Sequence, residues 1–402
     1  MSRTWVSWPS LCESHADPAV VLALAFDPYR QATVAYERSE TIGRAEALIA
    51  LVGACPDVRV RRRGDLDWLV FLDSDTGLDD QPVSSYVRRP RVLARLGAST
   101  ASLPVAAGVA RDADLPGLPV DRLIRLADAA LGEAIGAHHS TVFADVQTLE
   151  RVAAAVTVAS RLAAAGEDEF VVHHQPIVEL GDRRIVGFES LMRWSTDDGL
   201  RMPADFLEVA EQTSMIVPIG RHTTERAIAD LAEIIIPRYG DDAFVTINMS
   251  IQELVAEGND PHLAGVLRRH GVNPANVWIE LGETQVITAD GQTAAVIGDL
   301  HDLGCTICVD DLGAGFSALR YVFDLPVDVL KVDRSLISAL GAGGTANAVV
   351  RAICGIARGV GATLVAEGIE NEETLTRVDA LGFDLGQGYL LGRPAPLTGA
   401  TG

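Results

Sequence analysis

From about residue 165 onward, the chain repeats one pattern of apolar and polar positions. A short apolar, often β-branched run comes first, then a segment with helical spacing such as residues 203–220, 293–304 or 347–361, then a Gly or Pro break. The runs predict strands and the segments between them predict helices. The strand-like runs are 170–178, 184–194, 244–250, 277–283, 306–313, 327–333, 363–370 and 383–391. Eight strands alternating with helices over about 230 residues predict an α/β fold of the (β/α)8, TIM-like type.

Each predicted strand but the first carries a polar residue near its C-terminal end. In a barrel of parallel strands these ends converge on one face, where active sites form. Any one such residue is at least as well explained as a solvated strand end or a helix cap. The whole set is not, because so many carboxylates at one mouth would repel one another. The residues are Glu189, Asn248, Glu280, Asp310, Asp311, Lys331, Glu367 and Gln387.

An excess of carboxylates at one mouth predicts divalent cations. Oxygen ligands favour Mg²⁺ or Mn²⁺ over zinc, and the sequence offers no competing His or Cys cluster. Asp310 can bridge two metals and Asp311 can bind the second, while Gly313 and Gly315 let the backbone turn closely around them. Two cations a few ångströms apart suit in-line attack of water on a phosphodiester.

Composition narrows the class of protein. A length of 402 residues predicts two domains, and 48% hydrophobic with 22% charged residues is ordinary for a globular protein. No run approaches the roughly 18 apolar residues of a membrane span, and no signal peptide is visible, so we expect a cytoplasmic protein without a membrane segment. A net charge of −22 argues against binding a nucleic acid polymer, although a local basic cleft could hold a small phosphorylated ligand.

Two residue types stand out by their numbers. The five cysteines are scattered, and Cys305 and Cys308 lie three apart in an apolar run, which predicts a buried structural pair rather than a metal or redox site. Of the 33 basic residues only Lys331 is lysine. The simplest interpretation of the arginine excess is a coding bias. Lys331 then either survives by chance or has a role for a compact ammonium that a guanidinium cannot fill.

Residues 165–396 resemble the EAL domain, the cyclic di-GMP phosphodiesterase fold, over its whole length. The motifs that carry the resemblance are "HQPIV", "ESL" within "GFESLMRW", "NMS", "ELGE", "DDLGAGFSAL", "LKVD", "AEGIE" and "QGY". The resemblance implies a barrel with one antiparallel strand at its start. It also implies hydrolysis of cyclic di-GMP to linear pGpG and a homodimer formed through the barrel.

The resemblance also assigns roles to individual residues. The residues expected to hold the first metal are Glu189, Asn248, Glu280 and Asp310. Those expected to serve the second are Asp310, Asp311 and Glu367. Lys331 would position and polarise the attacking water, with Gln387 completing the shell around water and metal. The expected substrate contacts are Gln175, Leu191 and Arg193, the last on a phosphate. Glu283 would brace the loop after Asp311, a loop that couples the metals to dimer contacts.

The sequence departs from the family pattern at a few positions. Ser190 replaces the Ala of the naming motif, a change between small residues. Leu312, Ala314 and Ala318 replace Phe, Thr and Ser in and after the "DDFGTG" loop, so hydroxyl groups that could order this loop are lost. This motivates an alternative to the enzyme: a catalytically silent receptor for cyclic di-GMP. A third alternative is a scaffold that binds no nucleotide.

The N-terminal region carries a fainter resemblance. Residues 57–72 and 100–134 resemble the GGDEF domain, the diguanylate cyclase fold, in pattern and order. The family motif is replaced here by Gly64-Asp65-Leu66-Asp67-Trp68, and Asp27 alone stands near an expected metal-binding aspartate. We therefore predict a degenerate, regulatory or dimerising domain over 1–150, a helical connector over 151–168 and the barrel over 169–398. A fold unrelated to GGDEF remains the alternative for the first domain.

Overall fold

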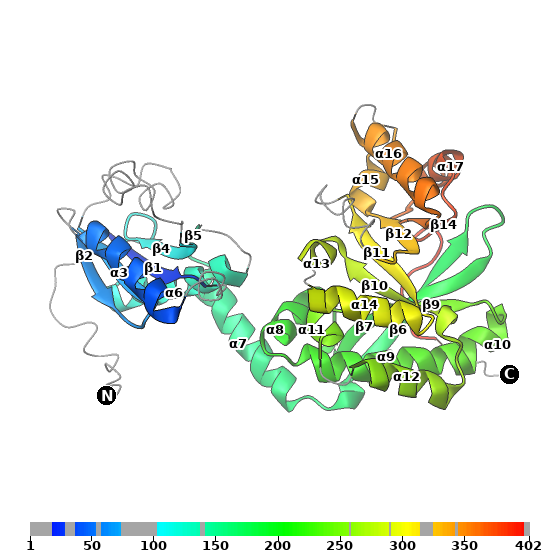
Figure 1. The fold of residues 1–402 in the computed structure, drawn as a ribbon, viewed down its shortest axis with the longest axis horizontal. Helices are drawn as coiled ribbons and strands as arrows, with labels where there is room; N and C mark the ends of the chain where they lie inside the picture. Colours follow the sequence, from blue (N-terminus) through cyan, green and yellow to red (C-terminus); the bar gives the residue numbers. More distant parts are fainter. Residues whose placement is uncertain are drawn as a thin grey trace. The chain divides into compact units, whose positions relative to one another are not determined.

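The computed structural model divides the chain into two compact units, Met1–Thr157 and Val158–Gly402 (Figure 1). None of the helices among the described residues is both long and apolar enough to span a membrane. The described residues are 18–28, 37–53, 58–73, 103–136, 141–256, 259–288, 291–313, 325–341 and 345–397.

The first unit is a five-stranded sheet in the order β2-β3-β1-β4-β5. Strand β1 (Val20–Phe26) pairs antiparallel with β3 (Asp67–Leu72) and β4 (Val105–Arg111). All seven residues of β1 are buried. Its alternate side chains enter two apolar clusters, one shared with α3 (Arg38–Gly53) and the other with α6 (Val120–Gly136). A strand covered on both faces has no polar face, which explains why β1 reads as a continuous apolar run.

The edges of this sheet are shorter strands. Strand β2 (Val58–Arg62) forms an antiparallel hairpin with β3, and the segment Gly64-Asp65-Leu66 lies at its turn. Strand β5 (Thr141–Phe143) runs parallel to β4. Helix α7 (Thr148–Ala164) and a 3-10 turn (Glu167–Glu169) occupy most of the segment predicted as a helical connector.

The second unit contains a closed barrel of eight strands. In spatial order they are β6 (Phe170–Glu179), β14 (Leu385–Gly386), β13 (Thr363–Ala366), β12 (Val329–Val332), β11 (Thr306–Leu312), β10 (Val277–Gly282), β9 (Phe244–Asn248) and β7 (Ile185–Thr196). The pairing of β6 with β7 closes the barrel. Strand β6 is antiparallel to both neighbours and the other pairs are parallel. The predicted barrel with one antiparallel strand at its start is confirmed.

Helices surround the barrel (Figure 1). The longer ones are α9 (Ile216–Asp230), α12 (Asn259–His270), α14 (Gly291–Asp302), α16 (Thr345–Val360) and α17 (Glu372–Leu381). The short ones are α8 (Leu207–Gln212), α10 (Ile236–Tyr239), α11 (Ile251–Leu254), α13 (Glu283–Thr288) and α15 (Arg334–Ser338), with a π-helical turn (Leu231–Ile235) between α9 and α10. Strand β8 (Gly199–Arg201) extends β7 as a hairpin.

The barrel strands bury both faces. One cluster fills the barrel interior with Ile177, Phe244, Val329 and Val365, and includes Cys308. A larger cluster lies between strands and helices and includes Cys305. The two cysteines are therefore buried free thiols in different clusters, as their spacing in a strand predicts.

Two sequence expectations need correction. The helical pattern over 203–220 is divided into a 3-10 turn (Pro203–Asp205), α8 and α9, because Ser214 adopts a left-handed conformation with φ 58° that no helix continues. The predicted last strand, 383–391, pairs only over Leu385–Gly386. Beyond it the chain hydrogen-bonds to the segment after β13, since the Ile369 N–H donates to the carbonyl of Gln387.

A buried carboxyl group supports the start of α11. The Oε2 atom of Glu253 accepts hydrogen bonds from the backbone N–H of Ser250 at 2.8 Å and from its hydroxyl at 2.7 Å. Gly220 on α9 makes room for the carboxyl, because a Cβ atom there would lie 1.6 Å from Oε1 of Glu253. Only 6% of Glu253 is exposed, and this burial raises its pKa from 4.5 to about 7.

This pKa predicts a loss of stability as pH rises. Between pH 4.5 and 7 the folded protein holds a proton on Glu253 that the unfolded chain releases, so folding weakens with rising pH, by up to about 3 kcal/mol. Glu253→Gln keeps an oxygen for both Ser250 donors, and we expect it to lose less unfolding free energy between pH 5 and pH 8 in urea titrations. The exposed Glu373→Gln should behave as wild type. Equal pH dependence in both variants would contradict this.

Candidate metal and substrate site

The polar residues predicted at the strand ends do meet at the barrel mouth. Strand pairing sets their positions: Glu189 on β7 lies opposite Gln175 on β6, and Glu280 on β10 lies opposite Asn248 on β9. Lys331 comes from β12, whose four residues are all buried. The other residues are offset by two positions from these pairs, since Glu189 lies opposite Thr246 and Asp310 opposite Gly282. Such a stagger belongs to a closed barrel of tilted strands, and it leaves all these side chains at the mouth.

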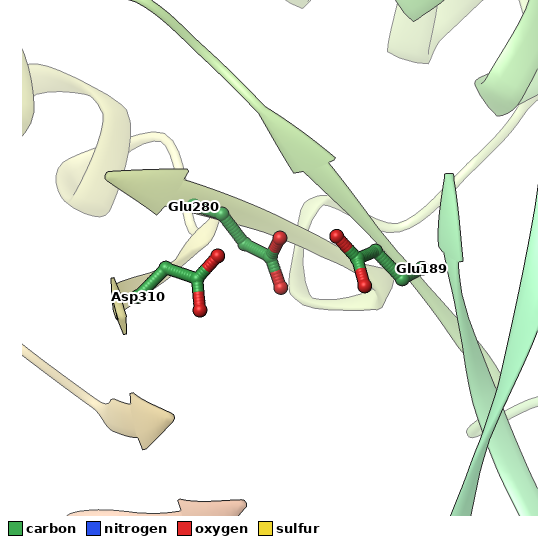
Figure 2. A group of neighbouring side chains, drawn as sticks. All are labelled: Glu189, Glu280 and Asp310. Carbon is green, nitrogen blue, oxygen red and sulfur yellow. The ribbon is translucent and has the colours of Figure 1, made fainter. Parts of the chain in front are cut away.

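Two groups of carboxylates are close enough to hold a metal ion each. Figure 2 shows Glu189, Glu280 and Asp310 directed toward one another from three strands, and one oxygen from each lies within 4.8 Å of the others. Asp310, Asp311 and Glu367 form a second group by the same measure. Asp310 belongs to both, as the sequence analysis expects of a bridging ligand.

The ammonium of Lys331 lies among these carboxylates. Its Nζ atom is 2.8 Å from Oε1 of Glu280 and 2.7 Å from Oε1 of Glu367. Asp310 is 3.3 Å away and Glu189 3.7 Å away. Only 1% of Lys331 is exposed. Burial alone lowers the pKa of a lysine, but four carboxylates outweigh it and hold the Lys331 pKa well above its usual range.

One ammonium does not neutralise the acids around it. Burial raises the pKa of Glu280 well above its usual range and that of Glu367 to about 8. Burial, with the charge of Asp310, raises the pKa of Asp311 to about 6. Glu189 is the exception: Lys331 and hydrogen bonds from Gln387 and Asn248 overcome its burial and lower its pKa. The site therefore has a surplus of negative charge that further cations would relieve.

The donor set fits Mg²⁺ or Mn²⁺. Both carboxylate groups offer only oxygen atoms. Oε2 of Glu280 is buried and accepts no hydrogen bond from the described residues. Asn248 donates its Nδ2 to Oε1 of Glu189 at 3.0 Å, which leaves its own carbonyl oxygen for another partner.

The two adjacent aspartates reach the same site because the end of β11 is irregular. Its pairing with β12 shifts register between Val309 and Leu312, and Asp311 has a left-handed φ of 58°. The N–H of Asp311 donates to Oδ1 of Asp310 at 2.8 Å. A regular strand would send consecutive side chains to opposite faces, whereas this bulge brings both to the mouth.

Glu283 holds the backbone that follows. It is buried, and its Oε2 atom accepts a hydrogen bond from the N–H of Gly313 at 3.1 Å. Gly313 has φ 109°, and a Cβ atom there would lie 2.1 Å from a methyl carbon of Leu336. Ala314 and the Ser317-Ala318 pair, where the sequence departs from the family, lie outside the described residues.

Two glutamines extend the site toward the C-terminal loop. Nε2 of Gln387 donates to Oε2 of Glu189 and, at 3.0 Å, to the side-chain oxygen of Gln175. Gln175 in turn donates to the carbonyl of Gly392 at 3.0 Å. Gln387 therefore orients Glu189. Its side-chain hydrogen bonds among the described residues go to Glu189 and Gln175 and not to Lys331.

Arg193 is a buried cation that lies near the charge of Glu189 but forms no ion pair in the described part of the chain. Only 4% of it is exposed, and its Nη1 atom donates to the carbonyl of Met192 at 2.8 Å. It makes no ion pair with any described residue, and burial lowers its pKa. A guanidinium in this state suits an anionic ligand.

A cavity of about 340 Å³ opens beside the carboxylates. Glu189, Glu280 and Asp310 line one end of it, and Leu191 lies along its wall. The far end is formed by residues from α8, α9 and α11, including Glu211, that the sequence analysis did not select. These residues sit on surface helices whose polar positions look like ordinary solvated ones, so no sequence signal distinguishes them.

Known proteins resemble the barrel region of this chain. Residues 159–394 match the EAL domain. An uncharacterized protein of Sinorhizobium fredii, y4lL, is 31% identical over 289 residues, which cover 70% of this chain and 34% of that protein. MucR of Pseudomonas aeruginosa, a bifunctional diguanylate cyclase and cyclic di-GMP phosphodiesterase, is 31% identical over 57% of this chain and 33% of its own. The chain thus spans about a third of the length of these curated relatives.

Solved structures of EAL proteins have a similar fold. The PaMucR phosphodiesterase in complex with c-di-GMP superposes with a TM-score of 0.56 at 30% identity, over 60% of this chain and 97% of that one. The EAL enzyme Bd1971, bound to cAMP and cyclic di-GMP, has a TM-score of 0.58 at 25% identity, over 83% of this chain and 80% of that one. The chain belongs to the EAL domain family.

Proposed function

We propose that this protein hydrolyses cyclic di-GMP to linear pGpG with two divalent cations, Mg²⁺ or Mn²⁺. The observation that carries the proposal is the pair of carboxylate groups that share Asp310 around the Lys331 ammonium at the barrel mouth. The phosphodiesterase and cyclic di-GMP complexes among similar EAL structures support the choice of substrate.

In this proposal the two metals share Asp310. Glu189, Asn248 and Glu280 would complete the first site, and Asp311 and Glu367 would complete the second. When bound, the cations would supply Lewis-acid activation of water and neutralise charge on the phosphodiester.

Lys331 acts as a hydrogen-bond donor. Its pKa stays well above the usual range, so its ammonium cannot accept a proton and instead holds and polarises the attacking water. Gln387 keeps Glu189 oriented through the hydrogen bond described above. Arg193, which is buried and forms no ion pair with a described residue, binds a phosphate of the substrate, while Gln175 and Leu191 contact the rest.

For the first unit we propose a degenerate GGDEF domain over 1–150 that regulates or dimerises the enzyme, joined through the connector 151–168 to a barrel at 169–398. The β2–β3 hairpin, whose turn carries Gly64 and Asp65, supports this. The carboxylate of Asp65 is already 3.1 Å from Arg38, which leaves it poorly placed to hold a metal. A homodimer through the barrel belongs to the same proposal.

Hydrolysis is tested directly. With Mn²⁺, we expect the wild type to convert cyclic di-GMP to pGpG, and Lys331→Ala and Glu280→Gln each to lower the rate at least about 100-fold, because each removes a group from the centre of charge stabilisation. Chromatography of the products measures this. Glu179→Gln, an exposed acid at the far end of β6, is the matched control and should retain activity. Binding without hydrolysis by the wild type would instead establish the receptor.

Metal binding is tested without substrate. A ligand at 100 times its dissociation constant stabilises a fold by about 2.7 kcal/mol, so we expect Mn²⁺ to raise the unfolding temperature by about 5 °C or more. Asp310→Asn should lose this response, because Asp310 serves both carboxylate groups. An equal rise in wild type and variant in differential scanning calorimetry would refute this assignment of ligands.

The first unit should not cyclise GTP. The test uses the Glu280→Gln variant, so that any cyclic di-GMP formed would survive. With GTP and Mg²⁺ we expect no dinucleotide by chromatography, since the turn lacks the paired glycines that allow close backbone approach to a phosphate. Accumulation of cyclic di-GMP would show that the domain is a working cyclase.

A further inference from the structure

One polar side chain on the mouth-facing side of β6 and β7 has no role in the proposed function. Antiparallel pairing places His173 opposite Leu191, and the next pair on that face is Gln175 with Glu189. Arg193 follows on β7, two residues beyond Leu191. Side chains two residues apart share a face of a strand, and the register shift in this pairing lies outside these residues. His173 therefore lies on one face with all three expected substrate contacts.

The neighbouring histidine faces the other way and is engaged there. Nε2 of His174 is 3.1 Å from Oδ2 of Asp230 on α9, and its Nδ1 is 3.3 Å from the hydroxyl oxygen of Ser190. His173, by contrast, is partly buried and makes no hydrogen bond or ion pair with a described residue. Both nitrogen atoms of its ring are therefore available to a ligand.

The charges around His173 favour an anion beside it. Burial lowers the pKa of His173, and the positive charge of Arg193 and the neighbouring His174 lower it further. No described acid contributes to this shift. Arg193 itself lies near the charge of Glu189 and near Tyr389 of the C-terminal loop, but it forms no ion pair in the described part of the chain. An anion that contacted both His173 and Arg193 would relieve their mutual repulsion.

We propose that His173 is a further substrate contact, which together with Arg193 binds the phosphodiester of cyclic di-GMP that is not cleaved. This rests on the proposed function, because it takes a cyclic dinucleotide as the substrate. Such a ligand carries two phosphodiesters on opposite sides of its ring, and only one of them can be attacked at the metals. His173 is two residues, about 7 Å, along β6 from Gln175, so it reaches the ligand beside the carboxylate groups rather than at them.

The chemistry of the two side chains suits this phosphodiester. A guanidinium and a protonated imidazole both make charge-assisted hydrogen bonds to phosphate oxygens. In the free protein Arg193 disfavours a proton on His173, whereas a phosphate between them favours it. Binding therefore takes up a proton, and the contribution of His173 to affinity grows as the pH falls from 8 to 6.

The test measures binding of cyclic di-GMP to the full chain by calorimetry in EDTA, which removes the divalent cations. We expect His173→Ala to weaken binding about tenfold at pH 6 and about threefold or less at pH 8, because only the protonated ring makes the charge-assisted contact. His173→Gln keeps a neutral donor, so it should bind like wild type at pH 8 and more weakly at pH 6. Carboxylates at the mouth also titrate in this range, so the compared quantity is the ratio of wild-type to variant affinity at each pH.

Hydrolysis with Mn²⁺ gives a second measurement. A contact to the uncleaved phosphodiester is the same in the ground state and the transition state, so His173→Ala should raise KM while kcat stays within about threefold of wild type. His301→Ala is the matched control. This histidine lies in the last turn of α14, at the end of the barrel opposite the mouth, and its removal should keep the wild-type values. Thermal unfolding of each variant checks that it folds.

The outcomes separate this inference from the proposed function. If His173→Ala binds like wild type at both pH values, or if the loss is equal at pH 6 and pH 8, His173 does not bind the phosphodiester, even when the wild type hydrolyses the dinucleotide. A fall in kcat at unchanged KM would also overturn the assignment. If the loss depends on pH as expected but the wild type does not hydrolyse cyclic di-GMP with Mn²⁺, the contact stands and the phosphodiesterase does not. If wild type does not bind the dinucleotide, both are wrong.

Discussion

The buried ammonium of Lys331 is the interaction on which the barrel mouth depends. Glu189, Glu280, Asp310 and Glu367 come from four different strands or strand ends, and each lies within 4 Å of Nζ. Acids this close would repel one another or take up protons if no cation stood between them. A buried charge is also costly to leave unpaired, so the ammonium and the carboxylates require each other. The single lysine of the sequence thus lies where a compact cation is needed.

The barrel provides what this cluster needs. Because the strands bury apolar side chains both inside and against the helices, their backbone positions are fixed by packing rather than by the polar residues. The strand ends therefore hold the polar side chains in place, and the polar cluster does not have to stabilise the fold. Regular pairing sets most of these positions, and one bulge in β11 adds a second aspartate to the mouth. A rigid scaffold therefore carries a charge arrangement that would not hold together alone.

The distribution of charge around the site restricts where an anionic ligand can bind. The protein has a net charge of −22, and the mouth itself is acidic, yet the ligand that we propose is a dianion. Cations must therefore be local: Lys331, Arg193 without an acidic partner among the described residues, and the metals that the carboxylates would hold. The far end of the cavity carries the carboxylates of Glu211 and Glu253, and no basic residue is among the described residues that line it.

The sequence by itself predicted the barrel and the set of polar residues at the mouth, because apolar periodicity and the position of polar residues at strand ends are local properties. The antiparallel first strand was implied only by the resemblance to the EAL domain, since periodicity carries no strand direction. The sequence did not show why Asp310 and Asp311 reach the same site, since the bulge arises from pairing with β12. It also predicted one helical segment where the structure has α8 and α9, because one left-handed residue, Ser214, leaves no clear trace in the pattern. Glu211 became visible only when tertiary structure joined its helix to the cavity, because the sequence does not record which residues a cavity brings together.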